Sequence, residues 1–321
     1  MHYRRLGRSG LKVSEIALGT WVTFGDQIPE QSARELVHAA YDAGVNFFDT
    51  ADVYAHGQAE VVLGQAIRDL PRQALVLSSK VFSQTLPGPN GRGLSRKHIT
   101  EALHASLTRL GVDYLDIYFC QRFDPDTSIE EIVYSMDTLI RQGKILYWGT
   151  SEWRAYQIAE AIKTAEQHHL VPPSVEQPQY SMFHRRRVEI DLAPLCREFG
   201  LGLTTFSPLY HGLLTGKYNE GIPENARARL IDFAWIQERM TPDRIAIVQM
   251  LASVALDLGL STAQLAIAWL LRRKDVSSVI TGATSKEQLA ENLAAGEAAE
   301  KLDDTVLERI ERILGNHPDE E

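Results

Sequence analysis

The sequence contains few cysteines. Only Cys120 and Cys196 occur among 321 residues, and neither belongs to a CxxC pair or to a spacing typical of metal ligands. This excludes a disulfide framework of the secreted kind and predicts no metal site. No stretch reaches the roughly 18 consecutive apolar residues that a membrane helix requires. No apolar run follows the charged N-terminus as it would in a secretion signal. We therefore expect a cytoplasmic protein with no membrane insertion.

Basic charge is also scarce. The chain has 33 Lys and Arg residues against 42 Asp and Glu residues, which gives a formal net charge of −9. A surface that binds nucleic acid needs a basic face, so this balance excludes nucleic acid as a general partner. The dense basic run Arg185-Arg186-Arg187 is short and opens a helical pattern. We interpret it as a solvated or partner-facing turn.

Short apolar runs alternate with helix-period segments along most of the chain. The runs that predict strands are 16–18, 46–49, 74–78, 114–119, 145–149, 175–177, 202–206 and 278–280. The segments that predict helices are 30–43, 58–69, 96–110, 128–142, 154–168, 188–199, 262–272 and 286–296. Strands that alternate with helices pair in parallel through right-handed crossovers. The pattern therefore predicts an α/β fold.

Eight such units close into a barrel, whereas an open doubly wound sheet, the alternative, usually begins with a glycine-rich βα turn. The first predicted strand is followed instead by Gly19-Thr20-Trp21, with no G-x-G-x-x-G motif. We predict a single-domain (β/α)8 TIM barrel over residues 1–321, with an N-terminal β-hairpin that turns at residues 7–10. Residues 83–94 and 210–240 predict long loops at the C-terminal face, where barrel enzymes build their active sites.

Three residues with complementary chemistry are expected at the mouth of this barrel. Asp49 ends the second predicted strand, Tyr54 lies in the following loop, and Lys80 comes just past the end of the third strand. A tyrosine has a pKa of about 10, too high for ready proton donation near neutrality. A nearby ammonium stabilises the phenolate, and a carboxylate can hold that ammonium in place. Each residue alone has an ordinary structural explanation, but the three together favour acid catalysis.

Segments distributed over most of the chain carry a more specific signal. They read LGTWVTFG (18–25), GVNFFDTA (44–51), GLSRKHI (93–99), YWGTSEW (147–153), FSPL (206–209) and SVITGA (278–283). In these segments the chain resembles the aldo-keto reductase superfamily. Within it, the chain resembles the branch of the voltage-gated potassium channel β subunits and their bacterial and plant relatives.

The resemblance implies a nicotinamide cofactor, usually NADP(H), that lies extended across the barrel mouth. It implies that Phe206 stacks on the nicotinamide ring, that Ser151 and Gln177 hold the carboxamide, and that Asp49 lies near the ribose. The other residues implied for the cofactor are Thr20, Trp21 and Gln27 at the entry, Ser207, Pro208, Leu209 and Lys217 along the pyrophosphate, and Gly282, Thr284, Gln288, Glu291 and Asn292 at the adenosine.

Residues near the adenosine end favour NADPH over NADH. Backbone N–H groups at a helix N-terminus bind phosphate well, and a short helix is predicted to begin near Ser285. Lys286 and Arg227 would add positive charge for a 2′-phosphate. Lys286 is explained equally well as a solvent-exposed lysine in a first helical turn, so NADH stays as the less favoured alternative.

The sequence departs from the wider family at one catalytic position. Most aldo-keto reductases complete an Asp, Tyr, Lys, His tetrad with a histidine at the end of the fourth strand, where this chain has Gln121. Potassium channel β subunits also lack the histidine and carry an asparagine. Gln121 can donate an amide hydrogen bond to a carbonyl oxygen but cannot titrate. Loss of one polar contact at developing charge costs on the order of 10²–10³ in rate. We expect a slow reductase that binds its cofactor tightly.

Two functions remain open. The leading one is NADPH-dependent reduction of aldehydes or ketones, with Tyr54 as general acid. Its substrate pocket would be shaped by Trp21, Tyr54, Phe82, Gln121 and Phe123. The alternative is a nucleotide-binding, redox-sensing partner subunit of the channel β type with incidental turnover. The family also implies a homotetramer, whereas the natural carbonyl substrate and any channel partner stay open.

Overall fold

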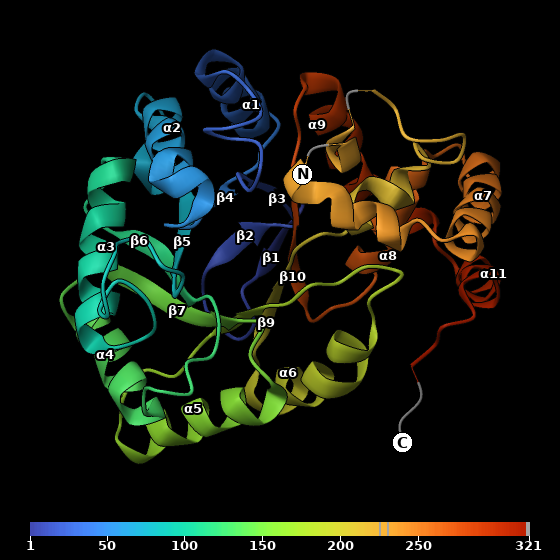
Figure 1. The fold of residues 1–321 in the computed structure, drawn as a ribbon. Helices are drawn as coiled ribbons and strands as arrows, with labels where there is room; N and C mark the ends of the chain where they lie inside the picture. Colours follow the sequence, from blue (N-terminus) through green and yellow to red (C-terminus); the bar gives the residue numbers. More distant parts are fainter. Residues whose placement is uncertain (225, 230, 319–321) are drawn as a thin grey trace.

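The computed structural model describes residues 1–224, 226–229 and 231–318. Eight parallel strands close a barrel in the order β10-β3-β4-β5-β6-β7-β8-β9, and helices surround it (Figure 1). The barrel strands are β3 (Ile16–Gly19), β4 (Phe47–Asp49), β5 (Val76–Val81), β6 (Leu115–Cys120), β7 (Ile145–Ser151), β8 (Val175–Gln177), β9 (Gly202–Thr205) and β10 (Val276–Thr281). This confirms the predicted (β/α)8 barrel.

The helices around the barrel begin and end at residues that favour those positions. In α3 the Ser95 hydroxyl caps the backbone N–H of His98, and Gly111 ends the helix at a φ of +67°. The helices predicted from the sequence are α1 (Glu30–Asp42), α2 (Gln58–Ile67), α3 (Arg96–Leu110), α4 (Ile129–Arg141), α5 (Ala155–Gln167), α6 (Ala193–Phe199), α8 (Thr262–Leu271) and α9 (Lys286–Leu293). A π-helix, η3 (Arg187–Leu192), precedes α6 in the segment predicted as one helix.

The predicted β-hairpin is present and closes one end of the barrel. Strands β1 (Tyr3–Arg5) and β2 (Lys12–Ser14) pair antiparallel directly before β3. Leu6 and Val13 are fully buried in the cluster that fills the barrel interior. Their partners are the inward-facing residues Ala17, Phe47, Val76, Ile117, Phe119, Val175 and Ile280. Because several of these residues begin their strands, the hairpin covers the N-terminal end and leaves the C-terminal end for the loops.

Several elements differ from the prediction. Two long helices, α7 (Pro242–Asp257) and α11 (Asp304–Leu314), were not predicted. Residues 210–240 are not a plain loop, because they contain 3₁₀ helices η4 (Tyr210–Thr215), η5 (Arg227–Arg229) and η6 (Ile231–Arg239). The remaining short helices are η1 (Tyr54–Gly57), η2 (Arg72–Ala74), α10 (Ala295–Ala298) and η7 (Ala299–Lys301).

Strand β5 is longer than predicted, so Lys80 lies inside the strand and not just past its end. The predicted strand ended at Ser78, the first of the two consecutive serines Ser78 and Ser79. Both hydroxyls are satisfied within the fold, because Ser78 donates to Asp49 at 2.6 Å and Ser79 donates to Glu60 at 2.6 Å. The extension fixes the backbone of Lys80 in the barrel wall.

The basic run at 185–187 is not the solvated turn predicted from the sequence. Arg185 is only 4% exposed and forms ion pairs with Glu189 and Glu311 at 2.9 and 2.7 Å. Arg187 pairs with the fully buried Glu176 at 3.1 Å. Carboxylates therefore neutralise two of the three arginines. The run does not form a basic surface for a ligand or partner.

No single helix in the described part of the chain is both long and apolar enough to cross a membrane. The bent pair α7 and α8 reaches the required length and composition only when the two helices are counted together.

The hairpin's role in the core is testable by truncating Leu6. We expect Leu6→Ala to lower the free energy of unfolding by about 2–5 kcal/mol, because the side chain is fully buried in the barrel interior. Urea unfolding followed by circular dichroism measures this change. Lys12→Ala, an exposed position on the same hairpin, should change it by less than about 0.5 kcal/mol. Equal effects of the two substitutions would contradict the buried role of Leu6.

Candidate active site

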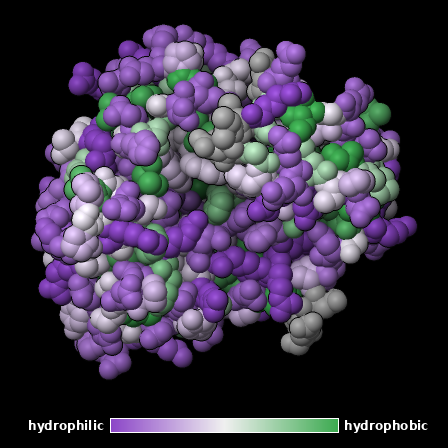
Figure 2. Space-filling view, viewed as in Figure 1, coloured by the Kyte–Doolittle hydropathy of each residue, from purple (hydrophilic) through white to green (hydrophobic). Residues whose placement is uncertain are grey.

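The predicted catalytic and nicotinamide-binding residues gather at the C-terminal ends of the strands. Asp49 ends β4, Ser151 ends β7 and Gln177 ends β8, while Gln121 and Phe206 directly follow β6 and β9. Parallel strands place all of these positions at one end of the barrel. The face viewed in Figure 1 is hollowed near its centre, with hydrophobic residues inside the hollow (Figure 2). This end of the barrel is therefore the candidate active site.

A buried ion pair lies at the centre of the site. The Lys80 ammonium donates to Asp49 Oδ2 at 2.6 Å and to the carbonyl oxygen of Thr50 at 2.6 Å. The other oxygen of Asp49 accepts hydrogen bonds from Ser78 Oγ at 2.6 Å and from Gln177 Nε2 at 3.0 Å. Asp49 and Lys80 are 3% and 1% exposed. Every charged atom of the pair thus has a partner, as a buried pair requires.

The ion pair keeps Lys80 charged. Burial alone would lower the pKa of Lys80, but the Asp49 carboxylate and the neighbouring Tyr54 outweigh it, and the net pKa is raised above the ordinary 10.5. The ammonium nitrogen lies 5.1 Å from the centre of the Tyr54 ring. A permanent positive charge is therefore held beside the tyrosine.

Tyr54 remains protonated near neutrality. Burial raises the pKa of its phenol above 10, and Lys80 acts in the opposite direction. The residue as a whole is only partly buried. A protonated phenol beside a fixed ammonium is suited to give up its proton when a nearby oxygen gains negative charge.

The backbone after Tyr54 is strained. Ala55 and His56 adopt φ values of +48° and +54°, and Gly57 follows at +86°. A left-handed conformation costs an ordinary L-residue about 1–2 kcal/mol, and glycine avoids this cost. The tight turn ends η1 and starts α2, whose first residue is Gln58. The turn fixes the backbone from which the Tyr54 side chain projects.

Gln121 directly follows β6, the fourth barrel strand, and lies beside the end of β5. Its backbone N–H donates to the carbonyl oxygen of Val81 at 2.9 Å. Its side-chain oxygen accepts a long hydrogen bond of 3.5 Å from Ser83 Oγ. The amide group is half-buried and keeps its N–H donors available for a ligand oxygen.

The predicted substrate-pocket aromatics have different environments. Phe82 follows β5, and the Arg92 guanidinium lies 5.2 Å from the centre of its ring. Phe123 packs edge-on against the buried Trp153, with ring centres 5.1 Å apart, so core packing accounts for much of its position. Trp21 is 38% exposed and its ring centre lies 6.4 Å from that of His211, on the segment after β9.

The predicted nicotinamide contacts form one connected group. Ser151 Oγ donates to the carbonyl oxygen of Gln177 at 2.9 Å, and the Gln177 side chain reaches Asp49. Thr20 joins the same group, because its backbone N–H donates to the Asp49 carbonyl oxygen at 2.9 Å. Phe206 is half-buried, and Ser207 after it has a φ of +54°. The structure thus brings Ser151, Gln177, Thr20 and the ion pair together.

The predicted pyrophosphate and adenosine residues lie on two other segments. Along the first, Pro208 is buried, Leu209 is half-buried, and Lys217 is exposed. The second is the start of α9, where Ser285 caps the helix and Gln288 accepts from Thr284 at 3.0 Å. The remaining predicted positions are Asn292, which donates to Gly282, and the exposed Gln27 and Glu291.

Of the two residues expected to select a 2′-phosphate, Lys286 already has a partner in the protein. Lys286 forms an ion pair with Glu35 at 2.9 Å, so a phosphate group would compete with this carboxylate for the lysine. The side chain of Arg227 lies outside the described part of the structure. Within the described residues, no group of three or more His, Cys, Asp or Glu side chains could hold a metal ion.

Comparison with known proteins agrees with this geometry. The family model described as the aldo/keto reductase family matches residues 15–314. The chain belongs to the aldo/keto reductase family. It is 48% identical to proteins named "Probable voltage-gated potassium channel subunit beta" from Arabidopsis thaliana and from Oryza sativa subsp. japonica. Each match covers 99% of this chain and 98% of the relative. The predicted resemblance is confirmed at the level of the family and of this branch.

Sequence reasoning missed two polar residues of this aldo/keto reductase site. Ser78 supports Asp49, and it faces the same side of β5 as Lys80 because residues two apart in a strand share a face. The register that pairs Asp49 with Ser78 brings the two together. Asp52 was also missed: it is 2% exposed, and neither carboxyl oxygen has a hydrogen-bond partner among the described residues. Nothing in the sequence distinguishes it from a solvated loop aspartate.

The buried Asp52 predicts a pH dependence of stability. Burial, and secondly the neighbouring Glu60 carboxylate, raise the pKa of Asp52 to about 8 from an ordinary 3.8. The unfolded chain therefore loses this proton first, and Asp52 lowers stability as the pH rises from about 4 to about 8. Asp52→Asn removes the effect. We expect the unfolding free energy of Asp52→Asn, relative to that of wild type, to increase by a few kcal/mol between about pH 4 and about pH 8.

Urea unfolding at pH 5 and pH 8 measures this difference. The exposed Asp26→Asn is the matched control and should show no such trend. A pH-independent difference between Asp52→Asn and wild type would contradict the burial of an unpartnered carboxyl.

Proposed function

We propose that this aldo/keto reductase uses NADPH to reduce aldehydes or ketones to alcohols, with Tyr54 as the proton donor. The observation that carries the proposal is the Lys80 ammonium, fixed by Asp49 at 2.6 Å and placed 5.1 Å from the Tyr54 ring centre. A general acid needs a proton at neutral pH and a stabilised conjugate base. The raised pKa of Tyr54 supports the first requirement, and Lys80 supports the second.

The proton is transferred at the Tyr54 hydroxyl group. A carbonyl oxygen that gains negative charge accepts the phenol proton, and the resulting phenolate is stabilised by the Lys80 ammonium. Asp49 holds that ammonium in place and is itself held by Ser78 and Gln177. The Gln121 amide donates to the same carbonyl oxygen. Because these groups are oriented before substrate binds, little reorganisation is needed during the reaction.

The residues present fit a nicotinamide cofactor. The buried Ser151 hydroxyl and Gln177 amide lie together at the barrel mouth, where they can hold a carboxamide. The aromatic Phe206 follows the neighbouring strand and can hold one ring face. When bound, NADPH supplies the hydride. We prefer NADPH to NADH because the start of α9 offers backbone N–H groups and Lys286, although Glu35 competes for this lysine.

Replacement of the Tyr54 hydroxyl tests the proposal directly. We expect Tyr54→Phe to lower the rate of NADPH oxidation with aromatic aldehydes by about 10²–10⁴, because the proton donor is lost. NADPH affinity, titrated by fluorescence, should stay within about twofold. Tyr134→Phe removes the hydroxyl of an exposed tyrosine and should leave both quantities unchanged. Full turnover by Tyr54→Phe would overturn the assignment.

The glutamine at position 121 predicts a slow enzyme. Gln121→His should restore an imidazole beside the reacting oxygen and raise kcat by up to about 10² with small aldehydes. Steady-state kinetics with saturating NADPH measure the change. An unchanged or lower kcat would show that Gln121 does not limit turnover.

A second proposal is a nucleotide-binding, redox-sensing partner subunit in the cytoplasm, assembled as a homotetramer. The plant relatives, at 48% identity over nearly the whole chain, are named as channel β subunits, which favours the role of a partner subunit. The same kinetic assay separates the two proposals. Tight NADPH binding without turnover of any carbonyl in a broad aldehyde and ketone panel would favour the sensor. Turnover that depends on Tyr54 would favour the reductase.

A further inference from the structure

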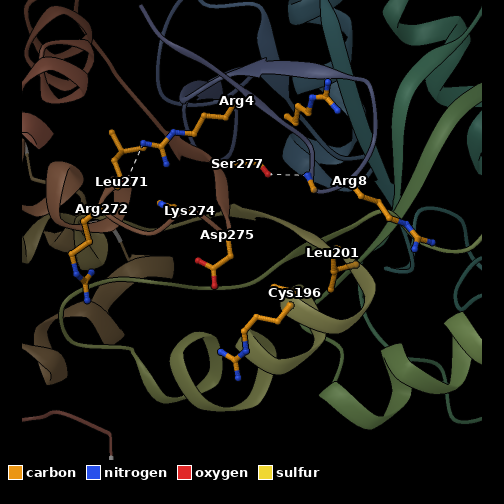
Figure 3. Close-up of a pocket in the computed structure, with 13 residues that line it drawn as sticks. Arg4, Arg8, Cys196, Leu201, Leu271, Arg272, Lys274, Asp275 and Ser277 are labelled. Carbon is orange, nitrogen blue, oxygen red and sulfur yellow. Dashed lines mark hydrogen bonds between the residues drawn. The ribbon is translucent and has the colours of Figure 1, made fainter.

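The N-terminal end of the barrel carries a second hollow, of about 700 Å³. We call it the basal pocket. Its walls come from the β1–β2 hairpin, the turn from α6 to β9, and the turn from α8 to β10 (Figure 3). These turns precede their strands, whereas Asp49 and Gln177 end theirs. The basal pocket therefore lies at the opposite end of the barrel from the candidate active site.

Cations dominate the rim of the basal pocket. Arg5, Arg8, Arg197 and Lys274 are exposed there, and none of the four side chains has a hydrogen bond or ion pair with the described residues. Asp275 is the single acidic residue of the lining. Its two carboxylate oxygens accept hydrogen bonds from Nε and Nη2 of Arg273 at 3.0 and 2.6 Å. Four positive charges without a charged partner among the described residues thus line one hollow, on a chain whose formal net charge is −9.

The remaining lining arginines have structural partners. Arg4 donates to the carbonyl oxygens of Leu271, Arg273 and Val276 and pairs with Glu15. These bonds tie the hairpin to the turn before β10. Arg272 stacks on Trp269 at 3.6 Å. Packing of the scaffold therefore explains these two arginines, but it does not explain the four exposed cations.

Close backbone contact holds part of the rim in place. The Arg8 N–H donates to the carbonyl oxygen of Gly200 at 2.8 Å, and the Arg8 stem lies against Gly200, where an added Cβ would come within 2.8 Å of Arg8 Cβ. The Gly7 N–H donates to Ser277 Oγ at 3.3 Å. The hairpin turn is thus fixed on the α6–β9 turn, which keeps Arg8 beside the hollow.

We propose that the basal pocket binds a small anion that carries two or more phosphate or carboxylate groups. In Figure 3, Arg8 lies on one side of the hollow and Lys274 lies on the other, with Asp275 between them. A ligand with several anionic groups can contact the cations on both sides at once. The volume suits a small molecule, and guanidinium groups bind phosphate and carboxylate through paired hydrogen bonds.

Calorimetric titration of the full chain tests the proposal, with inorganic tripolyphosphate and citrate as the two probes. The pocket variant Arg8→Gln/Lys274→Gln removes one arginine and one lysine from the rim. The matched control, Arg68→Gln/Lys163→Gln, removes the same charge from two exposed positions, one directly after α2 and one on α5, that have no partner among the described residues. Each titration is run with and without NADPH, because the candidate active site also contains phosphate-binding groups.

We expect wild type to bind at least one probe at a single site, with affinity that falls as salt rises. The pocket variant should bind that probe at least about tenfold more weakly, and the control should stay within about twofold. NADPH should not displace the probe. The response to the two probes separates phosphate from carboxylate ligands.

Three results would overturn the proposal: no binding of either probe at up to about 10 mM, equal weakening in both double variants, or full displacement by NADPH. If the pocket variant loses its native circular dichroism, the titrations are repeated with Arg197→Gln, which removes a cation from the α6 wall of the basal pocket. Arg68→Gln is the control for this variant.

Discussion

The buried pair of Asp49 and Lys80 is the constraint on which the rest of the site depends. Moving two charges out of water is costly, and their attraction compensates only when every other polar atom is also satisfied. Here Ser78, Gln177 and the Thr50 carbonyl oxygen supply those contacts from β5, β8 and the chain after β4. The barrel must therefore close with β4 paired to β5 in the observed register and with β8 across the centre. The same contacts hold the ammonium beside Tyr54.

The two ends of the barrel have different roles. The N-terminal end is closed by the hairpin, whose Leu6 and Val13 complete the interior core. The C-terminal end is left to the loops, where the polar network and the strained turn after Tyr54 lie. Strain at Ala55 and His56 can be tolerated because the core below them is formed by other residues. The separation also allows a charged basal pocket at one end without interference with the ion pair at the other.

Much of the fold could be predicted from the sequence, because eight apolar runs alternate with helical periods and the strand ends carry polar residues. The helix α7 escaped prediction because Ile245, Val248 and Met250 give it apolar residues on several faces, although Thr241 and Pro242 form a recognisable N-terminus. Arg185 was misread because its partner Glu311 lies 126 positions away. The sequence identified Asp49, Tyr54 and Lys80, but side-chain contacts across strands, such as Ser78 with Asp49, need the register of the barrel.

We propose that Lys80 serves the chemistry of Tyr54 and not the binding of the nucleotide. The most direct test is single-turnover stopped-flow measurement of NADPH oxidation by Lys80→Met with an aromatic aldehyde, beside fluorescence titration of NADPH. We predict native circular dichroism, NADPH affinity within a few-fold of wild type, and a rate reduced by about 10² or more. A folded Lys80→Met protein that binds NADPH and turns over at the wild-type rate would contradict the account.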